Sequence, residues 1–245
     1  MSEFRYHRPS NFPPVVKNLI ILNVLVWIAQ LSFHSKEFDL TDHIALYPVD
    51  APQFKIYQVI THMFAHAAYD SHGGIMFYHI LFNMFVLWMF GRVLENVWGP
   101  KRFLVFYILA GIGAAAAHLL VQHLRYDPEI IRQIVMADAN NDQAAYDYWI
   151  AKAGFLASAV GASGAIMGVM AAFAYLFPNT ELYIMFIPVP IKAKWAVLGY
   201  VALDLFLGVG SVSGDNVAHF AHLGGAITGF IIVFIWNKTN RRTLY

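Results

Sequence analysis

The chain of 245 residues contains no cysteine. Disulfide bonds, thiolate metal sites and a cysteine nucleophile are therefore excluded, and any nucleophile must be an oxygen or nitrogen group. Charged residues are scarce as well, at 13% of the chain, and the formal net charge is only +1. Because lysine and arginine form no cluster that resembles a nucleic-acid footprint, we expect no nucleic-acid partner.

Apolar residues make up 59% of the chain and the mean hydropathy is +0.53, which predicts a multi-span membrane protein in contact with the lipid bilayer. Backbone polar groups cannot stay unpaired in lipid, so each span should be a helix. We therefore expect an all-α membrane protein, a six-transmembrane-helix bundle that forms a single domain over residues 1–245. The six apolar segments lie near residues 15–34, 75–97, 103–124, 156–177, 195–213 and 217–237.

The distribution of lysine and arginine predicts the orientation of this bundle. The basic residues that fall on one side are Arg5, Arg8, Lys17, Arg92, Lys101, Arg102, Lys192, Lys194, Lys238, Arg241 and Arg242. The positive-inside rule places that side, and both termini, in the cytoplasm, with short tails at about 1–14 and 238–245. The first tail lacks the apolar core of a signal peptide, so we expect no cleavage there. We expect the membrane to be a bacterial-type plasma membrane.

Two long loops are predicted on the opposite, outer side, at about 35–74 and 125–155. Loops of this length in a compact protein are usually functional or disordered. The first is apolar enough to lie partly in the membrane interface. The second loop is acidic, and we expect it to be exposed to solvent and partly helical.

One serine stands among small residues within a long apolar segment, in the run Gly161-Ala162-Ser163-Gly164-Ala165-Ile166-Met167-Gly168. Such a run is typical of close helix packing in membranes. It is also typical of a reactive serine, because flanking glycines can present the hydroxyl to a substrate. Local sequence alone leaves both interpretations open.

Other polar residues inside the apolar segments share helix faces with one another. His79 and Asn83 are four residues apart, and His219 and His222 are three apart. Polar groups at membrane depth are costly and are functional candidates by default, although His79 and Asn83 could also be interhelical hydrogen-bond partners. The glycine pairs Gly164 with Gly168 and Gly225 with Gly229 predict that the fourth and sixth spans pack closely. This packing would bring Ser163 to His222.

These groups fit acyl transfer, and we expect the reaction to be the hydrolysis of a peptide bond. If Gly161 ends a descending loop, Ser163 begins a half-length helix whose free backbone N–H groups suit an anionic intermediate. His222 would be the base that activates the serine hydroxyl, and His79, Asn83 and the Ser163 amide would be oxyanion donors. A serine and a histidine can react without an acidic partner. Asp204 in the fifth span could belong to a proton path, but a single buried acid is more often a hydrogen-bonded structural residue, and we interpret it in this way.

The chain resembles the rhomboid family of intramembrane serine proteases over about residues 15–237. The motifs that carry the resemblance are GASG at Ser163, HILFN from His79 to Asn83, AHLGGAITG around His222 and GRVLENVWG from Gly91 to Gly99. The resemblance implies a Ser163–His222 dyad without a cofactor or metal, an oxyanion site at His79 and Asn83, and transmembrane proteins as substrates. His219 is interpreted as an accessory or packed polar residue.

The chain departs from the family pattern at three places. Tyr57-Gln58 stands where a Trp-Arg pair is common in the first outer loop. Met167 stands four residues after the serine, where an aromatic residue is common. Residues 67–78 resemble an insertion before the second span, which brings Asp70 and His72 to the outer mouth of the site. These differences concern gating, substrate choice and the orientation of the base.

Two other classes of function remain open. His62 and His66 lie at a helical i, i+4 spacing that could bind zinc, although no carboxylate has a companion spacing. A non-catalytic protein that binds membrane helices could use the same cavity as a protease. The sequence specifies neither the natural substrate nor the oligomeric state.

Overall fold

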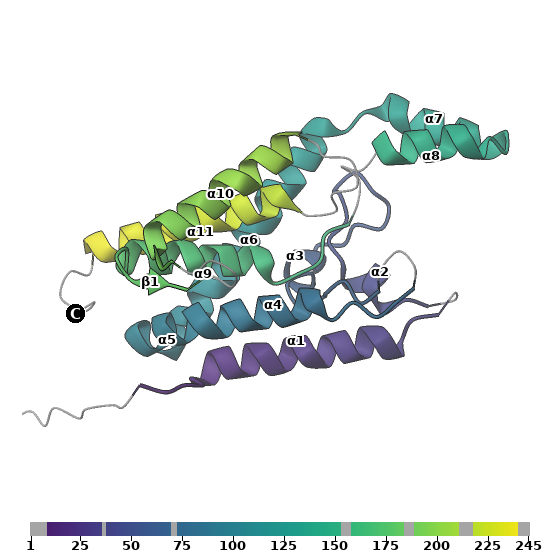
Figure 1. Cartoon of the computed structure of the whole chain (residues 1–245). Coiled ribbons are helices and arrows are strands. Elements are labelled where there is room, and N and C mark those ends of the chain that lie inside the picture. The colour runs from purple at the N-terminus through teal and green to yellow at the C-terminus, as the bar shows by residue number, and fades with distance from the viewer. Residues whose placement is uncertain are drawn as a thin grey trace, which may run out of the picture.

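A computed structural model describes residues 9–35, 38–69, 73–152, 158–183, 189–210 and 218–239, and the structural statements below concern those residues. Long helices dominate the chain (Figure 1). They are α1 (Pro14–Ser32), α4 (Tyr78–Val86) continued by the π-helical η1 (Leu87–Gly91) and α5 (Arg92–Trp98), α6 (Pro100–Arg125), α9 (Ser163–Leu176), α10 (Ala193–Gly210) and α11 (His219–Thr239). The shorter elements are α2 (Leu40–Ile44), α3 (Gln58–Thr61), α7 (Pro128–Ala139), α8 (Gln143–Lys152) and the antiparallel pair β1 (Glu181–Leu182) and β2 (Ile191–Lys192).

Local sequence explains where the first helices begin and turn. Pro14 starts α1, where its missing N–H is not needed for helix hydrogen bonding. The buried Glu95 carboxylate accepts hydrogen bonds from the next two backbone N–H groups, of Val15 at 2.9 Å and Val16 at 2.7 Å, and so caps the helix from α5. Gly99, at φ +79°, turns the chain from α5 into α6.

Four helical segments are long and apolar enough to cross a membrane: Pro14–Ser32, Tyr78–Trp98, Pro100–Arg125 and His219–Thr239. They correspond to the first, second, third and sixth predicted spans. The helix α9 has only 14 residues and α10 has 18, and neither belongs to this set. The chain is thus a mostly helical membrane protein with four candidate spans, and the total of six stays a prediction.

The prediction of a helix over 156–177 was wrong at its N-terminal end. Residues 156 and 157 lie outside the described residues, and the chain from 158 to 162 is not helical. Ala159 instead forms a two-hydrogen-bond bridge with Leu46 of the first outer loop, and Gly161 has a φ of +130°. The half-length helix that begins at Ser163 is confirmed.

The helices α6, α9 and α11 pack together at the centre of the bundle, with α1 and α4 along one side and α10 on the other (Figure 1). Three aromatic residues of α6, Phe103, Phe106 and Tyr107, are fully buried there. Large apolar side chains also face outward from α1, α4, α10 and α11, as expected of helices that contact lipid, for example Leu25, Phe85, Leu198 and Ile227.

The two ends of the bundle differ in character. The start of α1 and the end of α11 lie at one end, and α2, α3 and the α7–α8 hairpin lie at the other (Figure 1). The loop predicted at 125–155 is helical over α7 and α8, and side chains such as Val135 are exposed. This agrees with the expectation of an exposed, partly helical loop. Most of the predicted tails, residues 1–8 and 240–245, lies outside the described residues.

Candidate active site

Ser163 is the first residue of α9, and the chain before it is held by the first outer loop. The Gly161 N–H donates a hydrogen bond of 2.9 Å to the carbonyl oxygen of His62. Two residues earlier, Ala159 pairs with Leu46 through backbone hydrogen bonds of 2.9 Å in both directions. The serine thus stands at a helix N-terminus, where the first backbone N–H groups have no partner within the helix. The outer loop fixes the direction from which the chain reaches it.

His222 lies in the first turn of α11 and contacts the serine directly. Its Nε2 is 2.7 Å from Ser163 Oγ. The His222 side chain is only 8% exposed, whereas Ser163 is partly exposed. The structure therefore brings together the two residues that the sequence predicts as nucleophile and base, across 59 positions of the chain.

The glycines of α9 and α11 meet where the two helices cross. A Cβ added to Gly225 would lie 1.8 Å from the carbonyl oxygen of Gly164, and one added to Gly229 would lie 2.5 Å from Gly168 Cα. Side chains at these positions would force the helices apart. The short Ser163–His222 distance is compatible with this packing because both belong to the same helix crossing.

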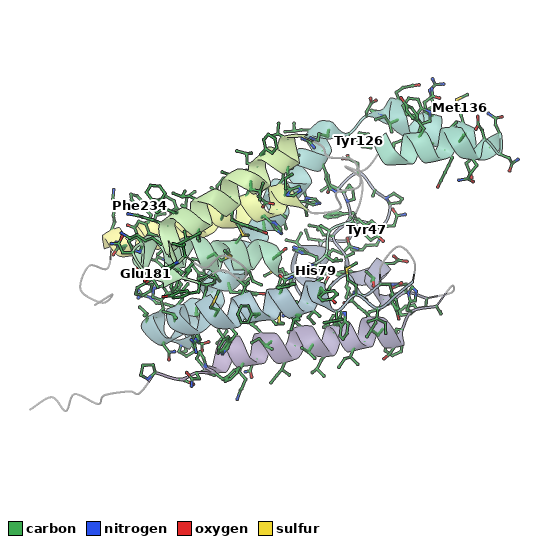
Figure 2. All side chains as sticks on the ribbon, viewed as in Figure 1. Tyr47, His79, Tyr126, Met136, Glu181 and Phe234 are labelled. Carbon is green, nitrogen blue, oxygen red and sulfur yellow. The ribbon has the colours of Figure 1, made fainter. Side chains whose placement is uncertain are left out.

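His79, in the first turn of α4, lies beside the serine. A Cβ added to Gly161 would be 3.1 Å from His79 Nε2 and 3.5 Å from Ser163 Oγ, so both groups border the same small space. His79 Nδ1 accepts the Ala67 N–H at 3.0 Å. A neutral imidazole that accepts at Nδ1 carries its hydrogen on Nε2, which therefore is a donor beside the serine. Figure 2 shows His79 at the end of the bundle that carries α2 and α3.

Asn83 lies one turn further along α4 and is nearly buried, at 8% exposed. Its Nδ2 donates a hydrogen bond of 2.7 Å to the His79 carbonyl oxygen, within the same helix. An amide nitrogen carries two hydrogens, so this bond uses one of them. The predicted role of Asn83 as an oxyanion donor stays a prediction.

Sequence reasoning missed a third group that contacts the base. Asp204 of α10 accepts a hydrogen bond from His222 Nδ1 at 2.9 Å on one carboxylate oxygen, and one from His219 Nδ1 at 2.5 Å on the other. The sequence favours a structural role for Asp204 because a single buried acid is more often a hydrogen-bonded structural residue. The signal that could have identified it was the histidine pair, since His219 and His222 share one face and a carboxylate can accept from both.

His62 and His66 do not form the proposed metal pair. The helix α3 ends at Thr61, so the i, i+4 spacing does not place both on one helix face. His62 Nδ1 contacts the Gln58 carbonyl oxygen at 2.8 Å, and His66 Nε2 contacts Asn23 Oδ1 at 2.8 Å. Within the described residues, no three histidine, cysteine, aspartate or glutamate side chains group as a metal site would require.

Burial gives these two loop histidines unusual acid–base properties. It lowers the pKa of His62 from 6.5 to about 4 and that of His66 from 6.5 to about 3. The nearby His79 also lowers the pKa of His66. Both rings are therefore neutral at pH 7, which suits their role in joining the outer loop to itself and to α1.

The residues that depart from the family pattern differ in their surroundings. Gln58 is buried, and its Oε1 accepts the Lys55 N–H at 3.0 Å while its Nε2 donates to the Gln53 carbonyl at 3.1 Å. Tyr57 beside it is half exposed. Met167 is buried in α9. Asp70 and His72 of the apparent insertion lie outside the described residues.

The fold and the site thus define a helical integral membrane protein with a hydrogen-bonded serine and histidine between two closely packed helices. The Rhomboid domain model matches residues 53–239, and the chain belongs to the rhomboid family.

Curated relatives include the rhomboid protease AarA of Providencia stuartii, 27% identical over 231 residues that cover 87% of this chain and 69% of that protein. Rhomboid protein 1, mitochondrial, of Saccharomyces cerevisiae is 28% identical over 63% of this chain. The human presenilin-associated rhomboid-like protein, mitochondrial, is 30% identical over 66%. The chain spans about a third of the length of these two mitochondrial relatives, 37% and 34%. Relatives from such different membranes do not favour the bacterial-type plasma membrane, which stays a prediction.

Proposed function

We propose that this protein is an intramembrane serine endopeptidase that cleaves transmembrane protein substrates, with Ser163 as the nucleophile and His222 as the general base. The observation that carries the proposal is the 2.7 Å contact between Ser163 Oγ and His222 Nε2 at the N-terminus of a short helix. Serine is a weak nucleophile until a base takes its proton, and histidine is the usual base near neutral pH. The similarity to the AarA protease supports the same chemistry.

In the proposed reaction, Ser163 Oγ attacks the scissile carbonyl carbon while its proton passes to His222 Nε2. The carbonyl oxygen then carries the negative charge of a tetrahedral intermediate. His222 returns the proton to the leaving amine nitrogen as the C–N bond breaks, which leaves an acyl-enzyme on Ser163. A water molecule, deprotonated by His222, releases the second product and restores the serine hydroxyl.

The oxyanion in this proposal is bound by the His79 Nε2–H and the Ser163 backbone N–H, with the second Nδ2 hydrogen of Asn83 as a further donor. The Ala67 N–H contact at His79 Nδ1 supports this assignment, because it keeps the required hydrogen on Nε2. No cofactor or metal takes part. The same proposal includes a single domain over 1–245 with six spans, both termini in the cytoplasm and outer loops at 35–74 and 125–155.

The experiment is active-site labelling of the detergent-solubilised protein with a serine-directed fluorophosphonate. We expect Ser163→Ala to abolish labelling and cleavage of a transmembrane test substrate while the thermal unfolding temperature stays unchanged. Ser32→Ala is the matched control, because Ser32 Oγ donates only to the Ile28 carbonyl of its own helix and this variant should be labelled like the wild type. Labelling that persists in Ser163→Ala would overturn the proposal.

Cleavage also separates the protease from a non-catalytic binding protein. If the wild type binds the test substrate but neither cleaves it nor reacts with the fluorophosphonate, the binding function is correct.

A further inference from the structure

A buried carboxylate links α10 to α11 behind the proposed base. Asp204 is 5% exposed, and its two oxygens accept hydrogen bonds from His219 Nδ1 at 2.5 Å and His222 Nδ1 at 2.9 Å. Burying an ionised carboxylate is costly unless its oxygens are hydrogen-bonded or paired with positive charge. Both oxygens have such donors here, and one donor is the imidazole that contacts Ser163.

The hydrogen bonds determine which tautomer His222 adopts. An ionised carboxylate can only accept, so His222 Nδ1 must carry a hydrogen. In the neutral ring Nε2 is then free of hydrogen, and it lies 2.7 Å from Ser163 Oγ. This is the tautomer that can take the serine proton; the other tautomer would point an N–H at the hydroxyl and could not act as a base.

We propose that Asp204 is a positioning residue for His222, so that the site works as a Ser163–His222–Asp204 triad assembled from α9, α11 and α10 rather than as a dyad. This inference rests on the proposed protease function. When Ser163 Oγ forms its bond to the substrate carbon, its proton moves to Nε2 and the imidazolium gains a positive charge beside Asp204. Asp204 takes no proton, and the same proton leaves on the amine nitrogen when the C–N bond breaks.

His219 has a supporting place in this arrangement. It lies three residues before His222 on the same helix face and binds the other oxygen of the carboxylate. With one oxygen held at 2.5 Å by His219, the carboxylate can present its second oxygen to His222 in a fixed direction. His219 is thus assigned to orienting the acid and does not compete with His222 for the serine.

Other titratable groups near these two residues have to be considered in any pH experiment. His79 and His118 interact electrostatically with His222, and Tyr200 does so with Asp204. At the outer end of α6, Arg125 donates a hydrogen bond to the Gly208 carbonyl at 3.3 Å. Tyr200 lies one turn before Asp204 on α10 and is 44% exposed, which makes it a suitable control position.

The test compares the pH dependence of cleavage by the wild type, Asp204→Asn and the control Tyr200→Phe in detergent. We expect Asp204→Asn to lower kcat by about 10²–10⁴-fold with KM unchanged within about threefold, because the base is held in the wrong tautomer. The acid limb of the kcat/KM profile should move to lower pH, because the imidazolium loses its counter-charge. Tyr200→Phe should match the wild type in both respects, and Asp204→Glu should recover part of kcat.

A kcat for Asp204→Asn within about threefold of the wild type, with the same pH profile, would overturn the triad while leaving the protease function intact. The protease function itself fails only if the wild type shows neither cleavage nor Ser163-dependent labelling.

A second measurement does not depend on the folding of Asp204 variants. In histidine-labelled protein, we expect a strongly downfield proton NMR resonance from the His222 Nδ1–H, present in the wild type and in Ser163→Ala and absent in His222→Ala. If no such resonance depends on His222, the carboxylate does not hold the base and the inference is wrong.

Discussion

Gly161 shows how much of the proposed site depends on one residue without a side chain. Its φ of +130° is a conformation that other residues rarely adopt, and an added Cβ would lie 3.1 Å from His79 Nε2, so the imidazole would have to shift by a few tenths of an ångström. Any larger residue would both strain the backbone and displace the imidazole that lies beside Ser163.

We therefore expect Gly161→Ala to lower the free energy of unfolding by about 1–3 kcal/mol through backbone strain. Cleavage should fall by up to about 10²-fold, because the strained backbone and the added Cβ displace the oxyanion donor from its position beside Ser163. Thermal unfolding and steady-state kinetics measure the two effects.

Gly99→Ala is the control that separates them. Gly99 also has a positive φ, +79°, but a Cβ there would meet nothing within 4 Å. This variant should lose stability without losing kcat; equal losses of kcat in both variants would contradict the role given to Gly161.

At the scale of helices, the glycine contact between α9 and α11 holds the serine and the histidine at their short distance. A Cβ on Gly225 would overlap the Gly164 carbonyl group. We expect Gly225→Ala to destabilise the protein by about 1–3 kcal/mol or more, since overpacked helices must separate. Fluorophosphonate labelling of Ser163 should slow in parallel.

The control for this prediction is Gly199→Ala on α10, where an added Cβ meets nothing within 4 Å. Replacing a helical glycine by alanine at an open position should leave stability unchanged or raise it by up to about 1 kcal/mol. Fast labelling of a stable Gly225→Ala protein would show that the close crossing is not required.

Patterns within single segments predicted much of this arrangement. Gly161 predicted where α9 begins, and the glycine spacing on α9 and α11 predicted that Ser163 meets His222. The contact of Asp204 with His222 was missed because it depends on how α10 is rotated against α11, which no pattern within either helix specifies. The Leu46–Ala159 bridge was missed because it is made by backbone atoms and leaves no trace in residue type.

The histidines of the first outer loop show the limit of spacing as a guide. His62 and His66 fit a helical repeat, but the chain leaves the helix at Thr61 and each ring finds a different partner. The helical spacing on which the metal interpretation depended is absent, because the tertiary contacts of the loop override the local structure that it assumed.

At the scale of the whole molecule, the same two histidines predict sensitivity to acid. Their pKa values are about 4 and 3 in the folded protein, below the ordinary value of 6.5, so the unfolded chain binds more protons at mildly acidic pH. The contribution of these two histidines to the free energy of unfolding is therefore fully present above pH 6.5 and is lost as the pH falls toward 4. Each histidine contributes a slope of up to about 1.4 kcal/mol per pH unit in that range.

Thermal unfolding between pH 7 and pH 4 in detergent tests this expectation. His62→Gln should reduce the slope, because glutamine does not titrate. His123→Gln is a control at an exposed histidine that pairs with Asp50 on the surface. An unfolding temperature that does not change between pH 7 and 4 would contradict the prediction.

The first outer loop contacts both halves of the proposed site through backbone hydrogen bonds, and the ring of its His66 also packs against the His79 ring, with centroids 5.2 Å apart. The carbonyl of His62 holds Gly161, which leads to the nucleophile, and the N–H of Ala67 holds the ring of His79. A displacement of this loop would therefore be transmitted to the proposed nucleophile and the proposed oxyanion donor together. The position of the loop thus sets the positions of Gly161 and of the His79 ring relative to each other.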